Sequence, residues 1–182
     1  MPKVTFVKKA QKDVEGTDIK AGESYYWWKF RYGGKHAQRT APKQSQLTQS
    51  EYLGTLYAIQ EQIDELDADD GLMSCVEDIA SQLRELASEC EDKRSNMPDA
   101  LQDSETGELL QNRADSCEGA ADELEGIDLE DFDEAEALED IKADHEGEGL
   151  TEEEIAALVE ESREEYWQGK LDEVQSVSIE IE

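Results

Sequence analysis

The chain has 182 residues, of which 48 are Asp or Glu and 17 are Lys or Arg, giving a formal net charge of −31. This charge disfavours binding of the whole molecule to nucleic acid or to an anionic membrane. It favours a basic partner, a cation atmosphere or self-repulsion as a solubility device. The 37% of hydrophobic residues can fill a modest core, so we expect a small domain plus an extension, with part of the acidic half solvated.

Cysteine spacing and the amino-terminal residues indicate the compartment. Cys75, Cys90 and Cys117 form neither a C-x-x-C pair nor a disulfide framework. Each falls on or beside an apolar stripe, which predicts small buried hydrophobes in a reducing cytosol. The first residues lack the apolar core of a signal peptide, and no window approaches the ~20 apolar residues of a membrane span. We therefore expect a cytoplasmic protein without membrane association.

Positive charge is concentrated at the amino-terminal end. Residues 1–48 hold ten Lys or Arg and four Asp or Glu, whereas residues 49–182 hold seven and forty-four. The first part therefore carries +6 and the remainder −37. Within the first part, Ser24–Thr40 combines cations with aromatic rings, which makes it a candidate functional patch.

The amino-terminal residues predict a small antiparallel sheet. Lys3–Lys9 alternates apolar and polar side chains as a half-buried strand does, and the polar residues 10–23 are expected to form a loop. Ser24–Thr40 is typical of a β-hairpin, in which Gly33 and Gly34 supply the two positive-φ residues of a tight type I′ turn.

This turn predicts the register, with Tyr32 opposite Lys35, and so assigns the side chains to two faces. Trp28 and Phe30 lie on the face expected to pack on the core. The free face mixes flat rings with cations, which suits stacking on bases and contact with phosphates, and equally suits packing on an acidic helix. The candidate nucleic-acid or docking residues are Trp27, Lys29, Arg31, Lys35, His36 and Arg39.

A strand, a basic aromatic hairpin and a helix are expected in succession between residues 3 and 60. Through Trp28-x-Phe30-Arg31-Tyr32-Gly33-Gly34-Lys35 and Arg39-Thr40, this segment resembles the three-stranded sheet and helix of the AP2-like, arm-binding domains of phage-type integrases. The resemblance covers about a quarter of the chain and implies a sheet that enters the DNA major groove. The positions it implies for DNA contact are Lys29, Arg31, Lys35 and Arg39. The acidic remainder departs from that family.

Three apolar stripes with heptad spacing predict an antiparallel helical bundle. After a proline-bearing linker, Thr48 and Glu51 predict a capping box that opens the first helix, and a turn is expected at residues 67–71. Because each stripe is narrow, one of them could instead face a second copy, so a homodimer is an alternative. The stripes are Tyr52, Leu56, Ile59, Ile63 and Leu66; Leu72, Val76, Ile79, Leu83, Leu86 and Cys90; and Leu110, Ala114, Cys117, Ala121 and Leu124.

Residues 122–165 carry twenty-one Asp or Glu and two basic side chains, yet apolar residues recur among them. A purely solvating tail would not need these apolar residues, so we expect ordered helices. One is predicted near residues 131–143, and another from a second capping box, Thr151 with Glu154, to about Val174. The alternating residues 177–182 predict a terminal strand beside the amino-terminal sheet.

The acidic segment is the strongest functional candidate. If residues 122–165 were helical they would span roughly 66 Å, with one carboxylate about every 3 Å, and one DNA strand places a phosphate every ~3.4 Å. This match predicts a DNA mimic that occupies the nucleic-acid channel of a DNA-handling protein, and the alternative is a merely solvated acidic face. The candidate mimic surface is Asp128, Glu130, Asp131, Asp133, Glu134, Glu136, Glu139, Asp140, Glu152, Glu153, Glu160, Glu161 and Glu164.

Residues suited to catalysis or metal binding are sparse. The chain has two histidines, His36 and His145, and the acidic turns at residues 67–71 and 144–149 do not fit a calcium-binding EF-hand loop. We therefore predict no catalytic residues, no metal ligands and no cofactor, and a protein that is not an enzyme.

Together these patterns predict an α+β, mostly helical fold, with a small antiparallel sheet that the carboxy-terminal strand could join and an antiparallel helical bundle. The expected domains are a basic hairpin (residues 1–47), a three-helix bundle (48–125) and an acidic helical segment (126–182). The predicted function is an acidic interaction protein of phage or mobile-element type that mimics DNA or inhibits a DNA-binding protein. The alternatives are a nucleic-acid-binding accessory protein that uses the basic hairpin and a coiled-coil assembly component.

Overall fold

A computed structural model describes residues 1–146 and 149–179, and the chain divides into two compact units, Met1–Glu61 and Gln62–Glu182. The fold is α+β and mostly helical, as the patterns predict, with a small three-stranded antiparallel sheet. None of the helices in the described ranges combines the length and the apolar composition needed to cross a membrane.

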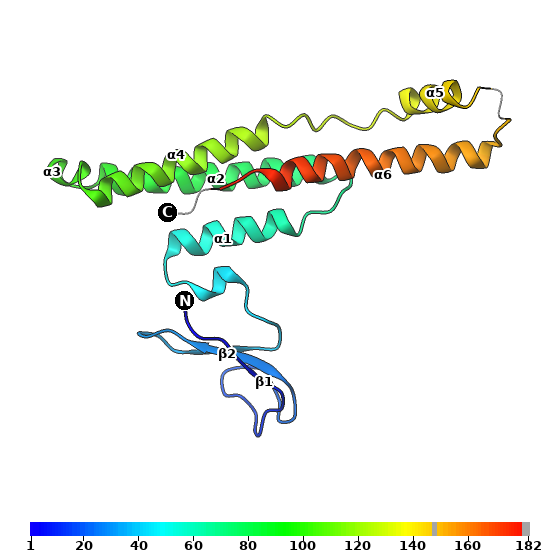
Figure 1. Cartoon of the computed structure of the whole chain (residues 1–182). Helices are drawn as coiled ribbons and strands as arrows, with labels where there is room; N and C mark the ends of the chain where they lie inside the picture. The colour runs from blue at the N-terminus through cyan, green and yellow to red at the C-terminus, as the bar shows by residue number, and fades with distance from the viewer. Residues whose placement is uncertain (147–148, 180–182) are drawn as a thin grey trace. The chain divides into compact units, whose positions relative to one another are not determined.

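The sheet of the first unit has the order β1-β2-β3, and its first two strands are rich in the aromatic and β-branched residues that favour extended backbone (Figure 1). Its strands are Thr5–Val7, Tyr25–Lys29 and Lys35–Gln38. The long loop between β1 and β2 closes on itself, because the Ala10 N–H donates to the Glu23 carbonyl at 2.7 Å. Ile19, a residue of this loop, is buried at 1% exposure.

The connection between β2 and β3 differs from the predicted two-residue turn. Lys29 pairs with Lys35, so residues 30–34 form the connection, and neither Gly33 nor Gly34 has a positive φ. Gly33 instead permits close approach, since a Cβ atom there would lie 3.3 Å from the Phe30 Cβ. The predicted register is therefore wrong, and a shift by an odd number of residues moves side chains to the opposite face.

An aromatic cluster accompanies the observed register. His36 is the cross-strand partner of Trp28, with the two rings stacked at a centroid distance of 5.4 Å, and Phe30 meets His36 edge-on at 5.6 Å. Trp28 is buried, at 4% exposure. His36 therefore lies on the same face as Trp28, and its assignment to the face of Trp27 and Lys29 is corrected.

Helix α1 (Glu51–Asp64) begins with a different cap from the one expected. The Ser50 hydroxyl accepts a hydrogen bond from the Leu53 N–H at 3.3 Å, which makes Ser50 the N-cap. Thr48 instead ends the short 3-10 helix Gln44–Leu47, and its hydroxyl accepts from the Ser50 N–H. The predicted Thr48–Glu51 capping box is therefore wrong by two residues.

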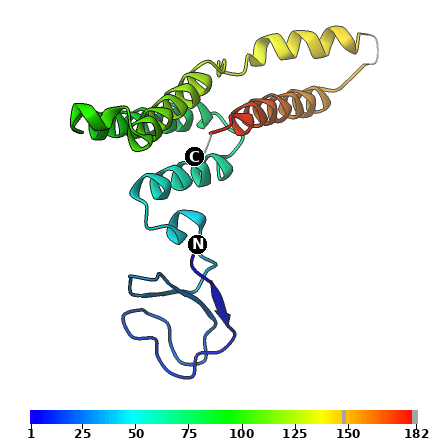
Figure 2. The same cartoon turned by 60° about the vertical axis from the view of Figure 1, so that its left-hand side comes forward.

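In the second unit, helices α2 (Leu72–Ser95) and α4 (Glu105–Glu125) lie side by side, joined through the short helix α3 (Asp99–Gln102) (Figures 1 and 2). The predicted stripes form their packing faces, and both Leu83 and Leu124 are fully buried. Small residues on α4 allow the close approach of the two helices. Cys90 and Cys117 are buried as predicted, whereas Cys75 is exposed, so the expectation for Cys75 is wrong.

Helices α5 (Glu134–Asp144) and α6 (Glu152–Ser176) confirm that the acidic segment contains ordered helices. The Asp133 carboxylate caps α5 by accepting from the Ala135 and Glu136 N–H groups. The predicted box at the start of α6 is present: the Thr151 hydroxyl accepts from the Glu154 N–H at 3.3 Å, and the Glu154 carboxylate accepts from the Thr151 N–H at 2.8 Å. The Thr151 N–H and, second, the Thr151 hydroxyl donate to the Glu154 carboxylate, each at 2.8 Å, and these two bonds lower the pKa of Glu154.

The acidic segment is not one continuous helix, because α5 ends at Asp144 and α6 begins at Glu152. The row of carboxylates that a single helix would spread over roughly 66 Å is therefore not formed, and the acids lie instead on two shorter helices packed against each other. The predicted carboxy-terminal strand is also absent from residues 177–179: Val177 and Ile179 are buried but belong to no strand. The rest of that prediction, residues 180–182, lies outside the described residues.

Candidate functional site

The acidic hairpin, defined here as residues 128–146 and 149–176, carries the predicted mimic surface. All thirteen predicted carboxylate residues are exposed on it. Helix α5 bears five Asp or Glu and α6 bears nine, against three basic residues on the two helices: Lys142, Arg163 and Lys170. The structure therefore brings together acids that are up to 36 positions apart in sequence, from Asp128 to Glu164.

An apolar seam holds the two helices together. Leu138 and Ile141 of α5 are half-buried, as are Ile155 and Leu158 of α6, and Val159 is buried at 6% exposure. These residues recur at the three- and four-residue spacing that places side chains on one helix face. The seam explains why apolar residues are interspersed among the acids.

Arg163 of α6 links the two helices of the acidic hairpin at the amino-terminal end of α5. Its guanidinium donates to Glu134 and to Glu160, each at 2.8 Å, and lies 5.6 Å from the centroid of the Phe132 ring. The Tyr166 hydroxyl donates to the Glu130 carbonyl at 2.7 Å, which ties the residues before α5 to α6. The position of the backbone that carries the carboxylates is thus defined by side-chain contacts.

Most of the predicted acids make no such contact. Glu134 and Glu160 pair with Arg163, and Asp133 caps α5. Within the described part of the chain, the side chains of the other ten neither form an ion pair nor accept a hydrogen bond. These ten are Asp128, Glu130, Asp131, Glu136, Glu139, Asp140, Glu152, Glu153, Glu161 and Glu164.

Two acids that the sequence analysis assigned only to a turn join this surface. Asp69 and Asp70, between α1 and α2, line a cleft of about 580 Å³ together with Asp131, Glu160 and Glu164. The lining also includes the rings of Phe132 and Trp167. Sequence reasoning missed Asp69 and Asp70 because their proximity to α6 arises from tertiary packing, and the Asp-rich composition of residues 67–70 was the only signal available.

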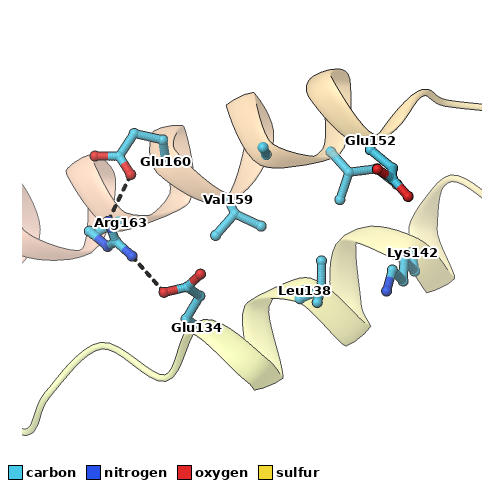
Figure 3. A pocket seen from close by; sticks show the side chains of 9 residues that line it. Glu134, Leu138, Lys142, Glu152, Val159, Glu160 and Arg163 are labelled. Carbon is cyan, nitrogen blue, oxygen red and sulfur yellow. Dashed lines mark hydrogen bonds and ion pairs between the residues drawn. The ribbon is translucent and has the colours of Figure 1, made fainter.

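A second cleft, of about 390 Å³, lies between α5 and α6 and is mostly apolar inside (Figure 3). Leu138 and Val159 project toward each other across it, and Ile155 and Ala156 complete the apolar lining. The Arg163–Glu134 ion pair lies at one end, and Lys142 and Glu152 lie at the other (Figure 3).

In the first unit, the predicted basic face is assembled in part. Lys29 and Lys35 are direct cross-strand partners on the face that carries Trp27, and the Lys35 ammonium lies 4.6 Å from the Trp27 ring centroid. Arg31 lies in the β2–β3 connection, with its guanidinium 5.3 Å from the centroid of the Tyr32 ring. In the described residues, no carboxylate lies within ion-pair distance of Lys29, Arg31 or Lys35.

Arg39 differs from these three cations because its charge is compensated locally. Its guanidinium donates to Glu23 at 3.1 Å and to Asp18 at 2.7 Å, and the bond to Glu23, followed by the charge of Asp18, raises the pKa of Arg39. The pKa of Glu23 is lowered, first by the hydrogen bond from the Lys20 N–H and then by the bond from Arg39. Arg39 thus anchors the β1–β2 loop within its own unit.

Two lysines that were not predicted extend the basic face. Lys9 and Lys12 line a wide groove of about 1060 Å³ together with Tyr25 and Lys35, and Asp13 and Glu15 lie among them. The cluster of lysines at positions 8, 9 and 12 was visible in the sequence, but the fold of the β1–β2 loop was not.

Neither unit shows an assembled metal centre in its described residues: no group of three or more His, Cys, Asp or Glu there could hold a metal ion. Comparisons with protein-family models, with curated proteins and with solved structures gave no match to this chain. Function is therefore inferred from the two charged surfaces themselves.

Proposed function

We propose that this chain is a non-enzymatic, cytoplasmic interaction protein whose acidic hairpin occupies the nucleic-acid-binding surface of a basic DNA-handling protein, as a DNA mimic or inhibitor. The observation that carries the proposal is a set of ten exposed, uncompensated carboxylates. Seven lie on the two helices that Arg163 and the apolar seam hold together, and three lie in the residues just before α5. A scaffold of this kind presents negative charge without the entropic cost of ordering a flexible tail on binding.

The arrangement of charge on the helices also favours a cationic partner. Glu136 and Asp140 lie four residues apart on α5, and Glu161 and Glu165 do so on α6. Like charges at this spacing destabilise a helix by a few tenths of a kcal/mol per pair. Lysine and arginine side chains of a DNA-binding surface would relieve this repulsion, and they would exchange their contacts with phosphate for contacts with carboxylate.

The dimensions of the scaffold support a compact mimic. At 1.5 Å per residue, α5 is about 16 Å long and α6 about 37 Å. Because the two helices pack side by side, the acids form adjacent rows, and the partner surface that fits them is a groove or channel.

The test uses a charge-neutralised variant of the full chain and a matched control. Five uncompensated acids of the acidic hairpin are replaced by amides: Glu136→Gln, Glu139→Gln, Asp140→Asn, Glu161→Gln and Glu164→Gln. The control removes five exposed charges from α2 and α4: Glu77→Gln, Glu85→Gln, Glu91→Gln, Glu118→Gln and Glu123→Gln.

Each immobilised protein is presented with the heparin-binding fraction of a cell lysate and eluted with a salt gradient. The unmodified chain and the control variant should retain the same proteins, and the hairpin variant should lose most of them. Equal retention by the two variants would show that total charge alone is responsible, and retention of nothing by the unmodified chain would reject the proposal.

A second candidate function is supported by the basic face. Lys29 and Lys35 stand directly opposite each other, where like charges destabilise a sheet, and a phosphate between them would offset that cost. We propose as the alternative that this face binds nucleic acid while the acidic hairpin recruits another protein. A labelled oligonucleotide should then bind the full chain and lose affinity on Lys29→Ala with Lys35→Ala; absence of binding by the unmodified chain would reject this alternative.

The coiled-coil assembly interpretation gains no comparable support. The stripe residues of α2 are buried within a single chain, as are Leu56, Ile59 and Ile63 of α1. These residues therefore do not need a second copy to be removed from water.

A further inference from the structure

The apolar cleft between α5 and α6 is a feature that electrostatic mimicry alone does not explain. Among its lining residues, Val159 is buried, Leu138 and Ile155 are half-buried, and Ala156 is exposed. If the two helices served only to display charge, larger apolar side chains between them could fill this cleft. Here the small side chain of Ala156 leaves the cleft open.

The surroundings of the cleft restrict what can occupy it. Three acids, Glu134, Glu152 and Glu160, and two cations, Lys142 and Arg163, line the cleft, and Arg163 pairs with Glu134 and Glu160. The two helices that form the cleft carry fourteen acids against three basic residues. A nucleic acid would be repelled by the excess negative charge of these helices, and a second copy of the chain, with its net charge of −31, would be repelled as well. The complementary occupant has apolar side chains for the interior and positive charges for the rim.

The shape of the cleft selects the form of that occupant. A groove between two packed helices accepts a third helix, whose apolar residues at i, i+3, i+4 and i+7 insert between the side chains of the pair. Lysines and arginines on the flanks of that helix would then meet Glu152 and the other uncompensated carboxylates of the two helices.

We propose that this cleft receives a basic amphipathic helix of the partner protein. The inference rests on the proposed function, and it adds an apolar contact to the electrostatic one. Charge on the acidic hairpin provides long-range attraction to a DNA-binding surface. The cleft provides selectivity among basic proteins, because a partner with the right charge and no apolar stripe fills it poorly.

The first experiment compares two peptides on the unmodified full chain by fluorescence anisotropy. One is a lysine-rich helix of about 18 residues with leucines at i, i+3, i+4 and i+7. The other has the same composition, with the leucines distributed around the helix. We expect the striped peptide to bind at least about tenfold more tightly, and to retain binding at a salt concentration that releases the other. Equal affinities, or no binding by either peptide, would overturn the inference.

The second experiment fills the cleft and uses a neighbouring residue as the control. Ala156 and Ala157 are adjacent, exposed residues of α6, and only Ala156 lines the cleft. Ala156→Trp should weaken the striped peptide about tenfold or more, and Ala157→Trp should change its affinity less than about twofold. Equal effects of the two variants would overturn the inference, and circular dichroism checks that both remain helical.

The outcomes separate this inference from the proposed function. Suppose that the peptide with distributed leucines binds as tightly as the striped peptide, and that the charge-neutralised variant still loses its retained proteins. The acidic hairpin then acts by charge alone, and only the inference about the cleft fails. If the charge-neutralised variant retains its proteins and the striped peptide still prefers the open cleft, the cleft binds helices and the mimic proposal fails.

Discussion

The Nη2 of Arg163 lies 2.8 Å from the Oε2 of Glu134, a residue 29 positions earlier in the chain, and this ion pair spans the two helices of the acidic hairpin. It sits at the end of the apolar cleft and beside the Phe132 ring, so one cation contributes both to the packing of α5 on α6 and to the arrangement of the surrounding carboxylates.

Replacing this cation should therefore loosen α5. Arg163→Met keeps an apolar side chain of similar reach while it removes both hydrogen bonds, so we expect amides of α5 to exchange with solvent several-fold faster. Hydrogen exchange measured by mass spectrometry reads this segment directly. Lys170→Met is the control, since Lys170 pairs with Glu173 within α6 alone, and equal acceleration of α5 by both variants would contradict the role given to Arg163.

Two glycines of α4 should respond in opposite directions to the same substitution. A Cβ atom at Gly107 would overlap the Gln102 carbonyl oxygen, whereas one at Gly119 would meet nothing within 4 Å. Gly107→Ala should therefore destabilise the second unit, and Gly119→Ala should stabilise it by about 0.5–1 kcal/mol because alanine favours helix. Urea titrations measure both changes, and a stable Gly107→Ala variant would contradict the close turn between α3 and α4.

The capping box of α6 predicts a pH-dependent contribution. Because the bonds from Thr151 lower the pKa of Glu154 from its ordinary value of 4.5, the stabilisation is complete above pH 4.5. It is lost as the pH falls through the lowered value. Glu154→Ala should therefore lower the melting temperature more at pH 7 than at pH 3.

The hydroxyl of the same box can be tested separately. Thr151→Ala should cost about 1 kcal/mol of helix stability, since it removes the group that satisfies the Glu154 N–H.

For the Glu154→Ala measurement, Glu153→Ala is the matched control, because the Glu153 side chain makes no hydrogen bond in the described residues. A constant difference in melting temperature between the unmodified chain and Glu154→Ala across pH 3–7 would argue against the carboxylate contact.

The observed strand register is tested by a charge reversal. Lys29→Glu converts a like-charge pair with Lys35 into an opposite-charge pair, and this should stabilise the sheet by about 0.2–1 kcal/mol. It leaves the contact between Lys35 and Trp27 in place. Lys8→Glu makes the same change in net charge at an exposed position outside the strands. If both variants gained stability equally, relief of repulsion between Lys29 and Lys35 would not be the cause.

Helical packing could be predicted from the sequence because its signal is local. Spacings of three and four residues identified Leu83 and Leu124 as core residues, and both are fully buried. The Thr151–Glu154 box was recognisable for the same reason, since its partners are three residues apart. Each of these features depends on neighbours within one or two helical turns.

Features set by tertiary contacts could not be predicted in this way. The β2–β3 register depends on the stacking of His36 on Trp28 and on the approach of Gly33 to Phe30, which a glycine pair in the sequence does not reveal. Among so many acids, nothing in the sequence marks Glu134 as the partner of Arg163. The joining of Asp69 and Asp70 to the acidic surface likewise depends on how the α1–α2 turn packs.

Competition between this chain and DNA for one captured protein shows whether the acidic hairpin takes the place of DNA. A protein retained by the immobilised chain is purified and bound to a fluorescently labelled duplex, and the full-length chain is then titrated in while anisotropy is followed at low and at high salt. If the acidic hairpin mimics DNA, the chain should release the duplex, and release should weaken steeply with salt. The hairpin variant with five amides should fail to release the duplex, whereas the control variant should release it. A ternary complex in which the duplex stays bound, or release that is unaffected by salt and by the five amides, would contradict the mimicry.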